Sequence, residues 1–344
     1  MSVCEIKPVS QQELAKWSDI VLDPSKSLVQ RAKALWGLRH AREPEALEYL
    51  GKFLINIHEN LHPAANELLQ HEAAYCLGQR GDAGAVPILI NVITDDKHAV
   101  IVRHEAAEAL AALAGRKGVD LNELKTILSK YQSCNHIELA ETCQIGLERL
   151  AYVQSISNTE SKIDLFNNIV DPAHPLDDKK SPKELKEMIM KSDLSLYIRY
   201  RALFTLRNEI ADLKRKRSSY SEEARLLSSC LTAPGSALLR HEIAFVLGEL
   251  SLPDTTEHLC LCVENLSEHP MVRHEAAEAL GDIMGNSRVE NLDELASRAE
   301  NCLKNHLVDE KQVVRESCVL ALDVADYISS EDFNYCSVPQ QLSA

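Results

Sequence analysis

Four histidine-glutamate pairs occur at matching places in two halves of this 344-residue chain. Within each half the two histidines are 33 residues apart, and the nine residues from Val102 to Leu110 return letter for letter as Val272 to Leu280. Imidazole nitrogens and carboxylate oxygens are common ligands of transition metals, so a repeated pair of this kind indicates metal chemistry. The pairs are His71-Glu72, His104-Glu105, His241-Glu242 and His274-Glu275.

Equivalent residues of neighbouring helical repeats project side by side, so we expect His71 and His104 to share one space with Glu105 beside them. Two imidazoles and one carboxylate are the usual donor set of a non-haem Fe(II) oxygenase, with open positions left for O₂ or water. If the two halves face each other across a pseudo-twofold axis, their donor sets form a dinuclear centre. The second half repeats the set with His241, His274 and Glu275.

The residues alone leave open which carboxylate binds the metal. Glu108 and Glu278 lie one turn beyond their histidines on the same helix face, so they are alternative ligands, although a surface role is the more ordinary interpretation. Their equivalents in the partner repeats are Tyr75 and Phe245. A purely structural role for the histidines is the competing interpretation. Packing, however, would use the pair in every repeat, and the outer repeats lack it.

The elements that must position these residues are paired helices. Leu28 to Leu38 has apolar residues at helical spacing, and Pro44 then begins a second helix, so the two are predicted to form one hairpin. Further hairpins are predicted from about Ala65 to Ile93 and from about His98 to Tyr131, and a fourth begins near Ile137. Helical pairs at this spacing indicate an all-α solenoid, in which each pair buries its apolar face against its neighbours.

Two such arrays of four hairpins are predicted, and only the two inner hairpins of each carry a His-Glu pair. The helical pattern lapses between the arrays into Ser, Asn, Asp and Pro, which is typical of a linker. The predicted organisation is an N-terminal extension (1–25) with an amphipathic segment, a first helical-repeat domain (26–153), a linker (154–181), a second helical-repeat domain (182–328) and an unstructured tail (329–344).

Composition limits the partners that we expect. A net charge of −15 argues against a nucleic-acid partner and suits a cationic one. No apolar run is long enough to cross a bilayer, and the start of the chain lacks the features of a signal peptide, so we expect a cytoplasmic protein without membrane contact. The ten cysteines show no CxxC spacing, which favours reduced thiols in the core.

Two four-repeat helical halves that carry four His-Glu pairs resemble the deoxyhypusine hydroxylase family, from about Leu28 to Asp326. The resemblance implies an α-solenoid of HEAT-like helical hairpins, with two four-repeat halves related by pseudo-twofold symmetry. It also implies a non-haem di-iron monooxygenase that hydroxylates the deoxyhypusine side chain on the precursor of eukaryotic translation initiation factor 5A, completing hypusine. The implied cofactor is Fe²⁺, two ions per chain, and the implied partners are that precursor, O₂ and an external electron donor.

The resemblance also assigns residue roles. Glu72 and Glu242 would serve the substrate, because a carboxylate that binds no metal can pair with the cationic amine of the deoxyhypusine arm. Met271, one turn before His274, would lie at the rim of the site and touch the arm, and a core role is the alternative. One iron would be held by His71, His104 and Glu105, and the other by His241, His274 and Glu275.

Two other classes of function compete with this interpretation. A non-enzymatic HEAT-repeat protein-binding scaffold would explain the solenoid and the acidic charge, but not the confinement of the His-Glu pairs to the inner repeats. A metal-dependent hydrolase usually uses a carboxylate-bridged, Asp-rich ligand set, which is missing from this sequence.

Overall fold

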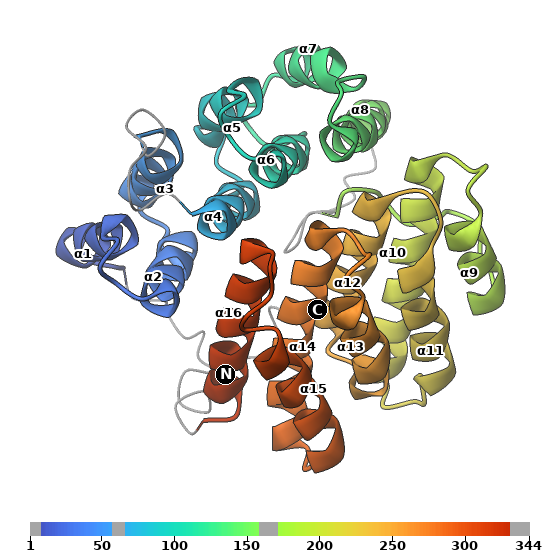
Figure 1. Cartoon of the computed structure of the whole chain (residues 1–344). Helices are drawn as coiled ribbons and strands as arrows, with labels where there is room; N and C mark the ends of the chain where they lie inside the picture. Colours follow the sequence, from blue (N-terminus) through green and yellow to red (C-terminus); the bar gives the residue numbers. More distant parts are fainter. Residues whose placement is uncertain (1–7, 57–65, 158–170, 331–344) are drawn as a thin grey trace, which may run out of the picture. The chain divides into compact units, whose positions relative to one another are not determined.

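A computed structural model describes residues 8–56, 66–157 and 171–330 (Figure 1). Over these residues the protein contains sixteen α-helices, two short 3₁₀-helices and no β-strand. The chain divides into two compact units, residues 1–164 and 165–344. No helix in the described part is long and apolar enough to cross a membrane.

The two units are described separately. The helices of the N-terminal unit are α1 (Gln11–Leu22), α2 (Leu28–His40), α3 (Pro44–Asn56), α4 (Glu67–Arg80), α5 (Ala85–Thr94), α6 (Val100–Ala112), α7 (Leu121–Tyr131) and α8 (Ile137–Ser157). Those of the C-terminal unit are α9 (Pro182–Met190), α10 (Leu196–Arg215), α11 (Ser221–Ser229), η1 (Cys230–Thr232), α12 (Ala237–Leu250), η2 (Pro253–Thr255), α13 (Thr256–Glu264), α14 (Pro270–Val289), α15 (Asp293–Asn305) and α16 (Gln312–Ile328).

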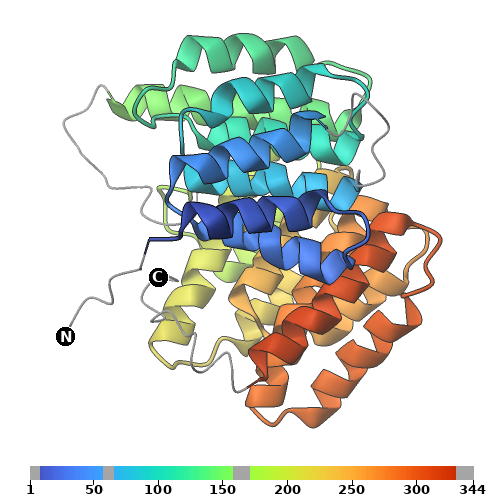
Figure 2. The same ribbon diagram turned by 90° about the vertical axis from the view of Figure 1, so that its left-hand side faces the viewer.

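Each hairpin consists of an outer helix followed by an inner helix. In the N-terminal unit α1 packs against α2, α3 against α4, α5 against α6 and α7 against α8, and the inner helices α2, α4, α6 and α8 pack in a row (Figure 1). From the side, these helices stack in chain order, from blue to green (Figure 2). The C-terminal unit follows the same plan from α9 to α16. The predicted all-α solenoid is therefore confirmed.

The predicted pairing within the hairpins is wrong. The helix from Leu28 was paired with the one that begins at Pro44, whereas in the N-terminal unit each inner helix packs chiefly against the helix before it. The reason lies in α1, which begins inside the predicted N-terminal extension and completes the first hairpin. Its sequence is largely polar, yet Leu14 is fully buried. An outer helix needs only one narrow apolar face, so its contribution to the array was underestimated.

A buried arginine at the start of the inner helix locks two hairpins of each unit. Its Nε donates to the carbonyl oxygen ten residues earlier, near the end of the outer helix. The last carbonyls of a helix lack partners within it, so a guanidinium there satisfies one of them and fixes the turn of the hairpin. The bonds run from Arg31 to Val21 (2.9 Å), Arg103 to Ile93 (3.0 Å), Arg199 to Ile189 (2.8 Å) and Arg273 to Val263 (2.8 Å).

The helices that carry the first histidine of each half begin and end alike. Asn66 caps α4 and Ser236 caps α12, each by accepting a bond from the backbone amide three residues on, at 2.9 and 3.0 Å. Both helices then end at a residue in the left-handed conformation, Gly81 (φ 71°) and Ser251 (φ 45°). These matched ends set the same helix rotation for the histidine that follows each cap by five residues.

Part of the predicted linker also packs on the solenoid. Ala173 is fully buried, and Arg201 of α10 donates to the carbonyls of His174 and Pro175 at 3.2 and 2.9 Å. The segment around these residues therefore belongs to the packed surface of the C-terminal unit. The predicted domain boundaries stay predictions, as does the pseudo-twofold relation between the halves. The predicted tail, apart from residues 329–330, lies outside the described residues.

Candidate metal centre

In the N-terminal unit, His71 of α4 meets His104 and Glu105 of α6. All three residues are buried, and His104 is fully shielded from solvent. The centroids of the two imidazole rings are 5.6 Å apart, and Nε2 of His71 lies 3.3 Å from Oε2 of Glu105. The structure therefore brings the three predicted ligands of this half together on two adjacent inner helices.

The C-terminal unit repeats this arrangement with His241 of α12 and with His274 and Glu275 of α14. The ring centroids are 5.5 Å apart, and Nε2 of His241 lies 3.2 Å from Oε2 of Glu275. One ligand atom from each of the three residues lies within 4.8 Å of the others. All three residues are buried.

Small residues five to seven positions beyond the histidines allow the helices to approach so closely. A Cβ built on Gly78 of α4 would lie 2.8 Å from the Cβ of Ala109 on α6. In the C-terminal unit, a Cβ on Gly248 would lie 3.0 Å from that of Ala279. Larger side chains would separate the helices, and the facing imidazoles would then move apart.

The alternative carboxylates, Glu108 and Glu278, also lie beside their histidines. His104, Glu105 and Glu108 each offer an atom within 4.8 Å of the others. Oε1 of Glu278 lies 3.5 Å from Nδ1 of His274 and also accepts a bond from Oγ of Ser317 on α16, at 2.7 Å. Glu278 is therefore engaged with the histidine ring and with the next inner helix, which suits a group that orients the ring.

The residues predicted to bind substrate differ in exposure. The Glu72 side chain is 13% exposed, its Oε1 lies 3.6 Å from Nδ1 of His71, and its Oε2 accepts a bond from Nε1 of Trp36 at 3.3 Å. Glu242 and Met271 are more deeply buried, at 3% and 2% exposure. Met271 lies in the first turn of α14, and its predicted contact with the substrate stays a prediction.

The carboxylates change the protonation of His71. Burial alone would lower the pKa of this imidazole, but its bond to Glu105 and the charges of Glu105 and Glu72 raise the pKa well above its usual value. Without a cation, the pair therefore holds a proton. A metal ion that binds here takes the place of that proton, since only neutral imidazole is a ligand.

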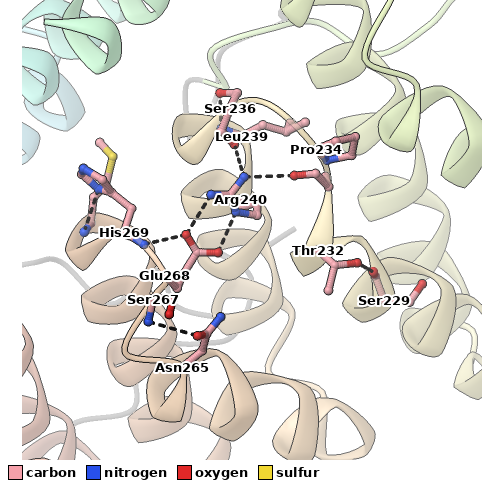
Figure 3. Close-up of polar contacts among 12 residues, drawn as sticks. Ser229, Thr232, Pro234, Ser236, Leu239, Arg240, Asn265, Ser267, Glu268 and His269 are labelled. Carbon is pink, nitrogen blue, oxygen red and sulfur yellow. Dashed lines mark hydrogen bonds and ion pairs between the residues drawn. The ribbon is translucent and has the colours of Figure 1, made fainter.

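A polar network fixes the start of α14 in the C-terminal unit (Figure 3). Arg240, next to His241, donates from Nε and Nη2 to the two carboxylate oxygens of Glu268, at 2.7 and 2.8 Å. Glu268 also accepts from the backbone amide of His269 at 2.6 Å, and Nδ1 of His269 accepts from the amide of Met271 at 3.3 Å. The network ties α14 to α12, so the two histidine helices of this unit are held in register.

Three supporting residues were not predicted as part of the site: Trp36, Glu268 and Ser317. The positions of Trp36 and Ser317 offered a weak signal, and that of Glu268 offered none. Ser317 follows Glu316 at the place where the inner repeats carry His-Glu, and Trp36 precedes Glu72 by about one repeat length. The position of Ser317 and Trp36 within their repeats could have placed both residues near the donor sets, but it could not have predicted their hydrogen bonds.

The donor sets fit a divalent transition metal. Each unit supplies two imidazoles and at least one carboxylate from neighbouring inner helices, which is the mixed nitrogen and oxygen set that non-haem iron prefers. Their burial keeps bulk water from the ligands. Fold and site together define a class of helical-repeat protein. Each of its two units contains a buried set of side chains of the kind that binds metal ions.

Comparison with known proteins gives the particular family. Residues 56–130 match the HEAT repeats family, so the predicted HEAT-like repeat is confirmed. The chain is 36% identical to deoxyhypusine hydroxylase of Drosophila melanogaster over 338 residues, covering 98% of this chain and 99% of the relative. The human enzyme of that name is 35% identical over 334 residues, covering 97% and 98%.

A solved structure of human deoxyhypusine hydroxylase, in complex with glycerol, gives a TM-score of 0.76 with this chain. The match has 35% sequence identity and covers 92% of this chain and 96% of the human one. The chain belongs to the deoxyhypusine hydroxylase family.

Proposed function

We propose that the protein is a deoxyhypusine monooxygenase that hydroxylates the deoxyhypusine side chain on the precursor of eukaryotic translation initiation factor 5A, using two Fe²⁺ ions and O₂. The observation that carries the proposal is the buried set of two histidines and one carboxylate, present once in each unit of a chain of this family. His71, His104 and Glu105 would hold one iron, and His241, His274 and Glu275 the other.

Glu72 and Glu242 would bind the substrate in this proposal. The deoxyhypusine arm ends in a primary ammonium group, and a carboxylate that is not bound to metal can pair with it through charge-assisted hydrogen bonds. Each carboxylate directly follows a proposed iron ligand in the sequence, so an ammonium held there fixes the position of the aliphatic carbons beside the metal-binding groups. Fixed positioning of this kind lowers the barrier of a reaction by removing the need for a chance encounter.

Bound iron would supply the activation of O₂ that hydroxylation of an unactivated carbon requires. In the balanced reaction one oxygen atom enters the substrate C–H bond and the other leaves as water. The reaction consumes two electrons and two protons, and the electrons come from an external donor. The protein's own part is to exclude bulk water through the burial of its ligands and to hold His71 neutral once a cation replaces its proton.

The test is metal analysis combined with a hydroxylation assay on protein purified without chelators. The proposal predicts about two irons per chain, and hypusine formation that stops when a chelator removes the iron. Iron-free protein that binds the precursor with full affinity would instead support the non-enzymatic HEAT-repeat scaffold. Hydrolysis of a phosphoester without uptake of O₂ would support the metal-dependent hydrolase.

A further inference from the structure

The indole of Trp36 on α2 reaches across to α4 and donates a hydrogen bond to Oε2 of Glu72. The other carboxylate oxygen of Glu72 lies near the ring of His71, at 3.6 Å from Nδ1. The two oxygens of Glu72 are therefore directed to different neighbours on different sides. A glutamate side chain has several rotatable bonds, and two such contacts restrict it to one orientation.

The C-terminal unit has a different residue at the equivalent place. Arg31 and Arg199 make the same bond at the start of α2 and α10, which fixes the alignment of the two helices. Trp36 follows Arg31 by five residues, and the residue five beyond Arg199 is Phe204. A phenyl ring has no N–H group, so Phe204 cannot give Glu242 the bond that Trp36 gives Glu72.

We propose that Trp36 is a positioning residue, which holds the Glu72 carboxylate in the orientation that binds the terminal ammonium of the deoxyhypusine arm. The two halves are then not equivalent toward the substrate, because Trp36 orients Glu72 through its N–H group and Phe204 has no such group for Glu242. This inference rests on the proposed function, because that function supplies the cationic arm.

Exposure supports the same assignment. The side chain of Glu72 is 13% exposed, so an arriving cation can reach it. The contact with Trp36 is also an aromatic one, because the rigid indole ring carries the N–H group that reaches Glu72. Rigid aromatic walls fix a carboxylate at a low cost in entropy when the substrate binds.

The first experiment compares Trp36→Phe with Trp17→Phe. The chain has two tryptophans, and Trp17 packs over Gly37 of α2, so its replacement is the same chemical change in the same unit. The probes are precursor protein with deoxyhypusine and precursor protein with unmodified lysine, and their difference in affinity measures the contribution of the arm. We expect Trp36→Phe to reduce that difference about tenfold with its iron content unchanged, and Trp17→Phe to leave the difference unchanged.

A double-mutant cycle separates positioning from general damage. In a Glu72→Ala background, Trp36→Phe should have no further effect on affinity, because the carboxylate that it positions is gone. An equal, additive loss in that background would overturn the inference. So would wild-type affinity in Trp36→Phe.

The hydrogen bond itself can be observed without substrate. In the Trp17→Phe chain the only indole N–H resonance in an NMR spectrum belongs to Trp36, and Glu72→Ala should shift it strongly. An unmoved resonance would overturn the inference even if Trp36→Phe failed to fold.

If the wild type neither distinguishes the two precursors nor hydroxylates either, the proposed function fails and the inference with it. If the wild type does both and Trp36→Phe matches it, only the inference fails.

Discussion

Nδ1 of His274 lies 3.5 Å from Oε1 of Glu278, one turn farther along α14. The same oxygen accepts the bond from Ser317, so the carboxylate is held between two inner helices. A carboxylate at one ring nitrogen fixes the orientation and tautomer of a histidine and makes the other nitrogen a better ligand. In the proposed site, Nε2 of His274 would therefore be the atom that binds iron, and Glu278 would orient the ring.

We expect Glu278→Gln to weaken iron binding about tenfold to a hundredfold, because the amide has no negative charge to support the imidazole. The measurement is a competition titration with a chelator of known affinity. Glu290→Gln, at the exposed end of the same helix, is the control and should leave iron affinity unchanged. Equal affinities of the two variants would show that Glu278 does not support His274.

His104→Ala should remove one metal position. This imidazole is fully buried on α6 and faces the ring of His71 on α4, and alanine offers no ligand atom in its place. Metal analysis should then find about one iron per chain instead of about two, and hypusine formation should be lost. His136→Ala, at an exposed position before α8, should keep both irons. Retention of both irons by His104→Ala would make the ligand assignment wrong.

Glu72→Ala should keep its irons and lose affinity for the deoxyhypusine-containing precursor. The side chain is assigned to the ammonium, so its removal deletes a charge-assisted contact and is expected to weaken binding about tenfold or more. Iron content and precursor affinity are measured on the same preparation. Loss of iron in this variant would move Glu72 into the metal ligand set.

Asp282 gives a prediction about pH. Its removal from water, and then the charges of Glu278 and Glu275, raise the pKa of Asp282 from 3.8 to about 7. A raised pKa means that the folded state holds the proton more tightly than the unfolded state. The contribution of Asp282 to stability is therefore complete below pH 3.8 and is lost as the pH rises toward 7.

We therefore expect Asp282→Asn to stabilise the metal-free protein more at pH 8 than at pH 5. The free energy of unfolding at pH 8 should exceed that of the wild type by roughly 2–4 kcal/mol. Urea unfolding at the two pH values measures the difference. An advantage of the same size at both would mean that Asp282 does not titrate in this range.

The repeated register of the His-Glu pairs could be predicted from the sequence because a solenoid converts sequence period into spatial adjacency. His71 and His104 are one period apart, and their rings face each other in the structure. Helix ends could also be predicted from the sequence, since residues such as Gly81 favour the left-handed conformation in which a helix commonly ends.

Contacts between side chains of different repeats could not be predicted in the same way. The bond from Trp36 to Glu72 and the bond from Ser317 to Glu278 depend on rotamers and on the spacing between helices. That spacing is set in turn by close contacts such as Gly78 against Ala109, which no periodic pattern reveals. Helix α1 was not predicted to be part of the helical array because its apolar face is narrow.

The most direct test of the proposed function is the fate of dioxygen. Iron-loaded protein, deoxyhypusine-containing precursor and a reductant are incubated under heavy-isotope-labelled O₂, and the modified side chain is analysed by mass spectrometry. The account predicts hypusine that carries one labelled oxygen atom, formed by the iron-loaded protein and not by the chelated one. Unmodified deoxyhypusine with the iron-loaded protein, or an oxygen atom that comes from water, would contradict it.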